Sequence, residues 1–211
     1  MSWFKRNDSP AAGAQPAALP VRHHSLAFET ALRELEREAA SGSRPLLLDL
    51  GPALGPNVEF FSERACRLQI VDLYRSLPDQ ALAAEPEQLA LDLASALPTP
   101  TVGATLVLAW DLFNYFRLEA LAALGLRLAE CTAPGGIVLA LVATHKDMPA
   151  RPQRYRILDP KTLETTVDGA STAAAPRYRQ PELERALPAF RVETTYLLRA
   201  GMQEYLLRRR K

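Results

Sequence analysis

Asp49 and the small residues that follow it could build a binding site for a nucleotide. Asp49 lies in the apolar run 46–50, which predicts a buried parallel strand, and a turn from Gly51 to Gly55 follows. The two glycines let a ligand approach the main chain, and the first N–H groups of the helix predicted over 58–64 would point at that ligand.

Two further acidic residues stand in apolar runs downstream. Asp72 ends the run 68–72, about twenty residues beyond the turn, where a carboxylate can accept hydrogen bonds from a ribose diol. Residues 89–93 are predicted to form a short third strand, and Asp92 lies near its end. The three acids would meet at the carboxyl edge of one sheet.

On these residues the chain resembles the class I S-adenosylmethionine-dependent methyltransferases. Their first motif, Asp/Glu-x-Gly-x-Gly-x-Gly, stands here as Asp49-Leu50-Gly51-Pro52-Ala53-Leu54-Gly55, with Ala53 in the place of the middle glycine. Asp72 matches the ribose-binding acid of the family, and Asp92 matches the acid near the adenine. The resemblance covers residues 45–208 and implies S-adenosylmethionine as cofactor. The cofactor-binding residues that it implies are Asp49, Gly51, Ala53, Gly55, Asn57, Asp72, Leu73, Asp92, Leu93 and Trp110.

The segment after the predicted fourth strand, 104–110, is where this family places groups that face the methyl donor. Asp111, Asn114 and Tyr115 could bind a polar substrate or take its proton. Alternatively, Asp111 caps the next helix and the neighbouring aromatic residues form core. His145, which follows the fifth strand at 137–143, could also serve as a base, although a packing histidine is the alternative. The candidate catalytic residues are Asp111, Tyr115 and His145.

Strands and helices alternate along residues 25–143, which predicts a parallel, right-handed, doubly wound sheet. A helix predicted from Ser25 to Gly42 precedes the first strand. Residues 190–198 and 202–207 predict a closing hairpin, as in the sixth and seventh strands of the family. The expected fold is therefore α/β and Rossmann-like: a mostly parallel sheet with a C-terminal antiparallel hairpin, in a three-layer sandwich.

Composition predicts one domain over residues 23–211, preceded by a disordered tail over 1–22 that is rich in Ala and Pro. The 25 basic and 24 acidic residues give no field that favours nucleic acid. With no signal peptide and no apolar run long enough to span a bilayer, a cytoplasmic location is expected. Cys66 and Cys131 are expected in helices as buried thiols, and no metal is expected, because His23 and His24 suit solvated loop positions better than a metal site.

The segment 144–180 interrupts the alternation and carries many arginines. It follows the fifth strand, where open α/β sheets bind ligands, so an anionic substrate or partner is one interpretation. A solvated charged loop is the other, and charge runs favour it.

Two functions follow from the resemblance. The first is methyl transfer from S-adenosylmethionine to a nucleophile on a small molecule or an exposed protein group. No Asn-Pro-Pro-Tyr or Asp-Pro-Pro-Tyr follows the fourth strand, which argues against the DNA and protein substrates of amino-methylating enzymes. The second is a non-catalytic binding or scaffolding module with a partner protein, which Ala53 and the stiffening Pro52 and Pro56 favour.

Overall fold

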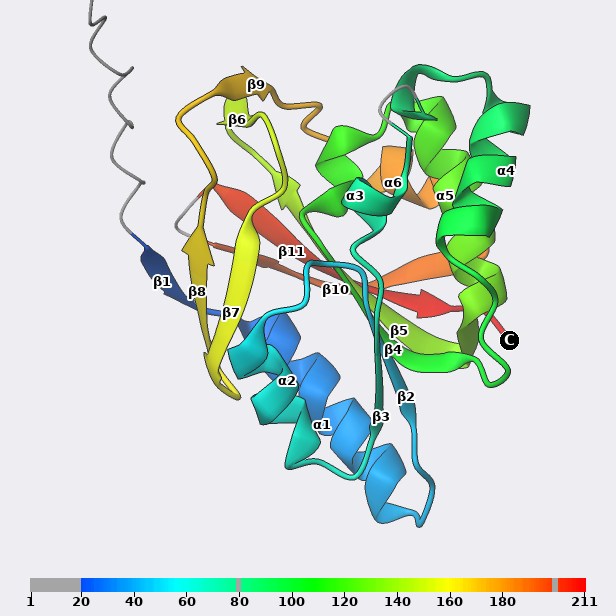
Figure 1. Ribbon diagram of the computed structural model, residues 1–211, viewed down its shortest axis with the longest axis vertical. Helices are drawn as coiled ribbons and strands as arrows, with labels where there is room; N and C mark the ends of the chain where they lie inside the picture. The colour runs from blue at the N-terminus through cyan, green and yellow to red at the C-terminus, as the bar shows by residue number, and fades with distance from the viewer. Residues whose placement is uncertain (1–19, 79–80, 199–200) are drawn as a thin grey trace, which may run out of the picture.

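The computed structural model describes residues 20–78, 81–198 and 201–211 (Figure 1). Its main sheet has the strand order β10-β11-β5-β4-β2-β3. Strands β2, β3, β4 and β5 are parallel, whereas β11 runs antiparallel to both β5 and β10. The bounds are β2 (Leu46–Asp49), β3 (Arg67–Ile70), β4 (Ala104–Trp110), β5 (Thr132–Ala143), β10 (Phe190–Leu197) and β11 (Met202–Arg209). The predicted α/β class and the closing hairpin are confirmed.

Helices cover both faces of this sheet and complete the three layers (Figure 1). Leu47 and Leu106 pack in one core with α1 and α2, and Leu48 and Val107 pack in a second core on the opposite face. Strands buried on both faces carry continuous apolar runs, which is why the sequence revealed them. The helices are α1 (Leu26–Ala40), α2 (Gly55–Ser62), α3 (Leu73–Ser76), α4 (Pro86–Ala96), α5 (Leu118–Cys131) and α6 (Gln180–Ala186), with the 3₁₀ turns η1 (Ala81–Ala83) and η2 (Leu112–Tyr115).

The strand predicted over 89–93 is wrong, because these residues lie in the middle of α4. Leu89, Leu93 and Leu97 follow one another at four-residue spacing and are all fully buried. That spacing places them on one face of a helix, and Pro86 stands in its first turn, where proline is tolerated. A five-residue apolar run does not by itself distinguish a strand from a helix segment.

The segment 144–180 is not a solvated loop, because it forms four strands. These are β6 (Asp147–Pro149), β7 (Arg154–Asp159), β8 (Thr162–Thr166) and β9 (Thr172–Ala174). β6 pairs with β9, and β7 and β8 form an antiparallel hairpin to which β1 (Val21–His24) adds a third strand. Val21 and Arg22 are therefore paired, so the tail predicted over 1–22 is too long; residues 1–19 lie outside the described residues. The organisation of the remainder as one domain stays a prediction.

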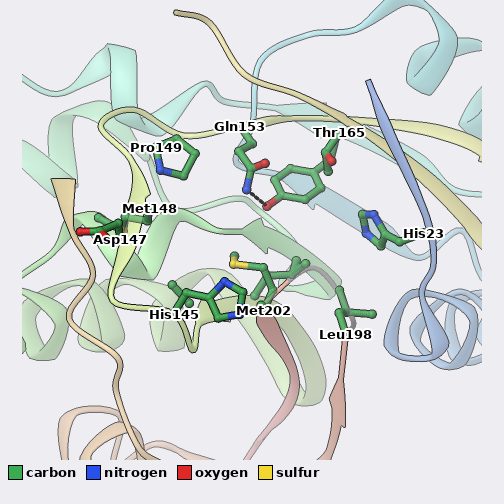
Figure 2. Close-up of a pocket in the computed structure, with 13 residues that line it drawn as sticks. His23, His145, Asp147, Met148, Pro149, Gln153, Thr165, Leu198 and Met202 are labelled. Carbon is green, nitrogen blue, oxygen red and sulfur yellow. Dashed lines mark hydrogen bonds between the residues drawn. The ribbon is translucent and has the colours of Figure 1, made fainter. Parts of the chain in front are cut away.

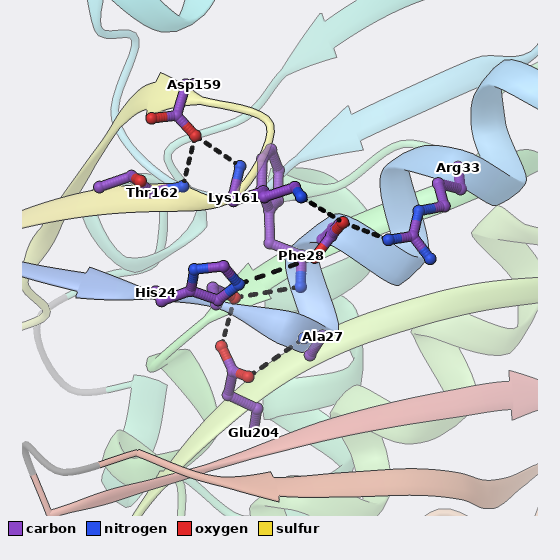
Figure 3. Close-up of polar contacts among 10 residues, drawn as sticks. His24, Ala27, Phe28, Arg33, Asp159, Lys161, Thr162 and Glu204 are labelled. Atoms are coloured by element: carbon purple, nitrogen blue, oxygen red, sulfur yellow. Dashed lines mark hydrogen bonds and ion pairs between the residues drawn. The ribbon is translucent and has the colours of Figure 1, made fainter.

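The start of α1 fastens this small sheet to the main one (Figure 3). Ser25 caps the helix as predicted and accepts a hydrogen bond from the Phe28 N–H at 3.0 Å. Glu204 of β11 accepts one from the Ser25 hydroxyl and another from the Ala27 N–H at 3.1 Å. Glu29, on the first turn, pairs with Arg33 and lies 3.4 Å from the Lys161 amine in the β7–β8 turn. These contacts hold the β7–β8 hairpin against α1.

Both cysteines are buried and free, as predicted. Cys131 is the last residue of α5, but Cys66 lies beyond the end of α2 rather than in a helix. Burial raises the pKa of both thiols.

Candidate functional site

The strand order places a ligand crevice between the carboxyl ends of β2 and β4. From β2 the chain goes first to β3 on one side and later to β4 on the other. Open α/β sheets bind ligands outside the strand ends at such a switch point. Asp49 ends β2 and Trp110 ends β4, so two of the predicted site residues meet there.

Asp49 is buried and already engaged. Its Oδ1 accepts hydrogen bonds from the Gly51 N–H at 2.9 Å and from the Trp110 indole N–H at 2.7 Å. Burial raises the pKa of this carboxyl to about 6. Asp49 therefore orients the turn and at the same time fixes the Trp110 ring.

Gly51 and Gly55 face different surroundings. A Cβ added at Gly51 would lie 2.9 Å from Cδ1 of Trp110, whereas one added at Gly55 would meet nothing within 4 Å. The missing side chain at Gly51 thus makes room for the indole ring. The turn is open only on its outer side, where Ala53 and Gly55 are exposed.

Tyr155 of β7 covers the crevice. Its ring stacks on the Trp110 indole, with 5.0 Å between centroids and 3° between planes, and only 3% of the residue is exposed. Asn57, near the start of α2, holds β7 in this position. Its amide donates to the Tyr155 carbonyl and accepts from the Ile157 N–H, both at 2.8 Å. Asn57 was expected to contact a cofactor. Instead, both the nitrogen and the oxygen of its side-chain amide form hydrogen bonds with β7.

Asp111 is a buried carboxyl with incomplete hydrogen bonding. Its Oδ2 accepts from the Gln153 N–H at 3.0 Å, while Oδ1 is buried and has no partner within the described residues. Burial raises its pKa to about 7, which suits a group that exchanges protons near neutrality. The capping alternative is wrong, because no side-chain hydrogen bond caps η2 at Asp111. The accompanying prediction that the neighbouring aromatic residues form core is confirmed, because Phe113 and Phe116 are core residues.

Tyr115 and Asn114 lie in the same turn and differ in role. The Tyr115 hydroxyl donates to the Pro149 carbonyl at 3.1 Å, and burial together with the Asp111 carboxyl raises its pKa. Asn114 is structural: its amide donates to the carbonyl of Leu141 and accepts from the N–H of Ala143 at the end of β5.

His145 borders a cavity of about 130 Å³ (Figure 2). Leu141 of β5 and Tyr155 of β7 also line this cavity. Gln153 lines this cavity and donates to the Tyr155 hydroxyl at 3.2 Å. His23 lines it as well, and neither of its ring nitrogens has a partner among the described residues. Burial lowers the pKa of His23, so this residue is not a solvated loop histidine. His24, also in β1, is exposed as expected.

Asp72 borders a separate cavity of about 150 Å³, which is also lined by Pro52 of the glycine turn. Its carboxylate caps α3 by accepting from the Arg75 N–H at 3.3 Å. The cavity is lined by Pro52, Asp72, Tyr74, Arg75, Arg151, Pro152, Arg154 and Asp168. It therefore joins the glycine turn and the predicted ribose acid to the arginines of the segment 144–180.

Three of the residues expected to bind cofactor lie elsewhere. Asp92 accepts a hydrogen bond from the Gln88 amide one turn earlier in α4, and Leu93 is fully buried in the core. Their placement at a strand end is wrong because that strand is a helix. Leu73, the first residue of α3, is also fully buried, although its N–H still reaches the Leu50 carbonyl beside the turn.

The crevice fits one part of S-adenosylmethionine. Asp72 and the open outer side of the turn suit a ribose, whereas the Trp110 ring occupies the space over Gly51 and Tyr155 stacks on that ring. The cavities of about 130 and 150 Å³ are also smaller than the roughly 300–1,000 Å³ of ligand pockets.

Tyr155 and Gln153 are the site residues that sequence reasoning missed. The signal was present: in β7, Tyr155 and Ile157 are buried and alternate with the exposed Arg154 and Arg156. Such alternation is typical of a half-buried strand.

No protein-family model and no curated protein matches the chain. Solved structures similar to it include an amino pentose methyltransferase from Micromonospora echinaspora bound to S-adenosylmethionine, with 16% identity, coverage of 86% of this chain and 91% of that one, and a TM-score of 0.47. Another is a 1,6-didemethyltoxoflavin N1-methyltransferase from Burkholderia thailandensis, with 19% identity, coverage of 87% and 80%, and a TM-score of 0.44. The likeness is distant and by itself identifies neither a family nor a ligand for this chain.

None of the helices in the described part of the chain has the length and apolar character to cross a bilayer. Within the same residues, no three His, Cys, Asp or Glu side chains are grouped as metal ligands would be.

Proposed function

We propose that this chain is a class I methyltransferase-like protein that binds S-adenosylmethionine at the carboxyl ends of β2 and β3 and transfers its methyl group. One observation carries the proposal: Asp72 and Pro52, which belongs to the glycine turn, line the same cavity beside the carboxyl ends of β2 and β3. The site lies outside the carboxyl ends of parallel strands, next to the switch point between β2 and β4, and a carboxylate beside a small-residue turn suits a ribose.

Asp72 would hold the ribose hydroxyls, and the open outer side of the turn at Ala53 and Gly55 would contact the nucleoside. Bound S-adenosylmethionine supplies a methyl group on a positively charged sulfur, which a nucleophile takes in line. Asp111 would be the base, because its pKa of about 7 leaves it able to accept a proton near neutrality and its Oδ1 has no hydrogen-bond partner within the described residues. The acceptor is a nucleophile on a small molecule or an exposed protein group.

A non-catalytic binding module is the second candidate function, and a specific observation favours it. The stack of Tyr155 on Trp110 covers the carboxyl end of β4, at the switch point of the sheet. In this alternative the fold and the acids persist, and the covered edge serves a partner protein.

Isothermal titration with S-adenosylmethionine and S-adenosylhomocysteine tests the proposal. We expect binding that Asp72→Ala weakens at least about tenfold, the order of one lost charge-assisted hydrogen bond. The matched control is Asp92→Ala, because Asp92 lies on α4 away from the cavity. Absence of binding by the folded wild-type protein would reject the enzyme and favour the module.

A further inference from the structure

The cavity beside Asp72 is lined by three guanidinium groups as well as by the predicted ribose acid. Arg75 comes from the last turn of α3, Arg151 from the connection between β6 and β7, and Arg154 from the first position of β7. The chain is nearly neutral overall, with a formal net charge of +1. Three arginines from separate segments around one small cavity are therefore a local concentration of positive charge.

The acidic residues in this cavity neutralise only part of that charge. Arg154 is paired with Asp168, with 2.6 Å between nitrogen and oxygen. Within the described residues, neither Arg75 nor Arg151 forms an ion pair with a carboxylate. The cavity thus keeps two guanidinium groups facing solvent beside one carboxylate. Guanidinium groups bind phosphate and carboxylate oxygens in pairs of hydrogen bonds, which makes this lining suited to an anion.

Tyr74 adds an aromatic surface to the same cavity. Its ring meets Tyr115 edge to face, with 5.4 Å between centroids and 69° between planes, and this contact holds it in place. An aromatic ring, a carboxylate for hydroxyl groups and guanidiniums for an oxyanion are together the groups that recognise a phosphorylated ribose. S-adenosylmethionine carries no phosphate, and its one anionic group is the methionine carboxylate, so a preference for phosphate distinguishes the two ligands.

We propose that this cavity binds a phosphorylated ribose, such as that of a nucleoside monophosphate, with the hydroxyls on Asp72 and the phosphate on Arg75 and Arg151. The site shares Asp72 with the proposed function and does not depend on methyl transfer. A volume of about 150 Å³ is small for a whole nucleotide, so the base would extend out of the cavity along the Tyr74 ring.

Adenosine 5′-monophosphate and adenosine form a matched pair of probes, because they differ only in the phosphate. Isothermal titration at low salt should show the monophosphate binding at least about tenfold more tightly than adenosine to the wild-type protein. Added salt should reduce this preference, because exposed arginines are screened. The variants are the double substitution Arg75→Gln with Arg151→Gln, and the control Arg191→Gln on the exposed face of β10. Arg75, Arg151 and Arg191 are all exposed, and substitutions of exposed side chains have little effect on stability, so all variants should fold.

The double variant should bind the monophosphate no more tightly than adenosine, while the control keeps the preference. Equal binding of the two probes by the wild-type protein, absence of binding by both, or a preference that survives the double substitution would each overturn the inference. Titration of the same proteins with S-adenosylmethionine separates the two proposals. If the wild-type protein does not bind S-adenosylmethionine, this result counts only against methyl transfer, because the preference for the monophosphate over adenosine is measured independently.

Discussion

The Tyr155 ring lies parallel to the Trp110 indole, with 3° between the ring planes and 5.0 Å between the centroids. Trp110 ends a strand of the main sheet, whereas Tyr155 belongs to the hairpin that crosses its edge. One aromatic contact therefore joins the β7–β8 hairpin to the crevice at the end of β4.

Replacing Tyr155 should uncover that crevice. We expect Tyr155→Leu to lower the free energy of unfolding by about 2–4 kcal/mol, because a fully buried ring is lost. If the crevice takes S-adenosylmethionine, the folded variant should bind it more tightly than the wild-type protein does. Tyr196→Leu on β10 is the control, since it removes an aromatic ring away from the crevice. Weaker binding by the Tyr155 variant alone would show that this ring contacts the ligand instead of covering its site.

Asn57→Ala should release β7 from α2. The substitution leaves the Tyr155 carbonyl and the Ile157 N–H without partners, at a cost of about 2–3 kcal/mol in the free energy of unfolding. Hydrogen exchange at Ile157 should accelerate. Asn114→Ala is the matched control, because it also removes buried amide bonds, but at the end of β5. Exchange at Ile157 that is equally fast in both variants would contradict the role assigned to Asn57.

Asp111→Asn should change how stability depends on pH. The pKa of Asp111 is raised by burial to about 7 from an ordinary value of 3.8. Between these values the folded protein keeps a proton that the unfolded chain loses, so stability falls as pH rises through this window. The variant lacks this fall. It should gain stability relative to the wild-type protein from pH 4 to 7, by on the order of a few kcal/mol.

Thermal unfolding across that range measures the effect of Asp111. Asp49, whose pKa is raised to about 6, keeps a smaller fall of the same sign in the variant. Asp92→Asn on α4 is the control and should follow the wild-type curve. Parallel curves for the wild-type protein and Asp111→Asn would mean that Asp111 titrates normally.

Gly51→Ala and Gly55→Ala should have different effects on the free energy of unfolding. At Gly51 the new methyl group meets the Trp110 ring, and overpacking of this kind costs about 1–3 kcal/mol. At Gly55 nothing lies within 4 Å, so the alanine should be neutral or stabilise by up to about 1 kcal/mol. Chemical denaturation compares the two directly. Equal effects would show that the indole ring is free to move away from Gly51.

The parallel core of the fold could be predicted because its strands are buried on both faces. The run 46–50 and Ala104–Trp110 are continuous apolar segments of this kind, and 104–110 was located to the residue. The run 89–93 has the same composition, yet α4 forms because Leu89, Leu93 and Leu97 share one helical face. A window that included Leu97 would have favoured the helix.

The candidate site was predictable only in part, because local pattern indicates which residues end a strand but not what covers them. Asp49 and Trp110 meet as expected, and Asp72 borders a cavity beside the turn. The residue that covers Trp110 comes from β7. This strand is held by hydrogen bonds from Asn57 to Tyr155 and Ile157, which lie 98 and 100 positions away along the chain. No spacing rule within one segment reveals such a contact.

The pairing of β1 with β8 has a consequence for the order in which the protein folds. Val21 and Thr165 are 144 positions apart, so closing this contact requires a large loss of chain entropy. Contacts of such separation form late, after the more local strand and helix units have assembled. We therefore expect the pairing of β1 with β8 to be among the last contacts to form and the first to open, before the parallel core is lost.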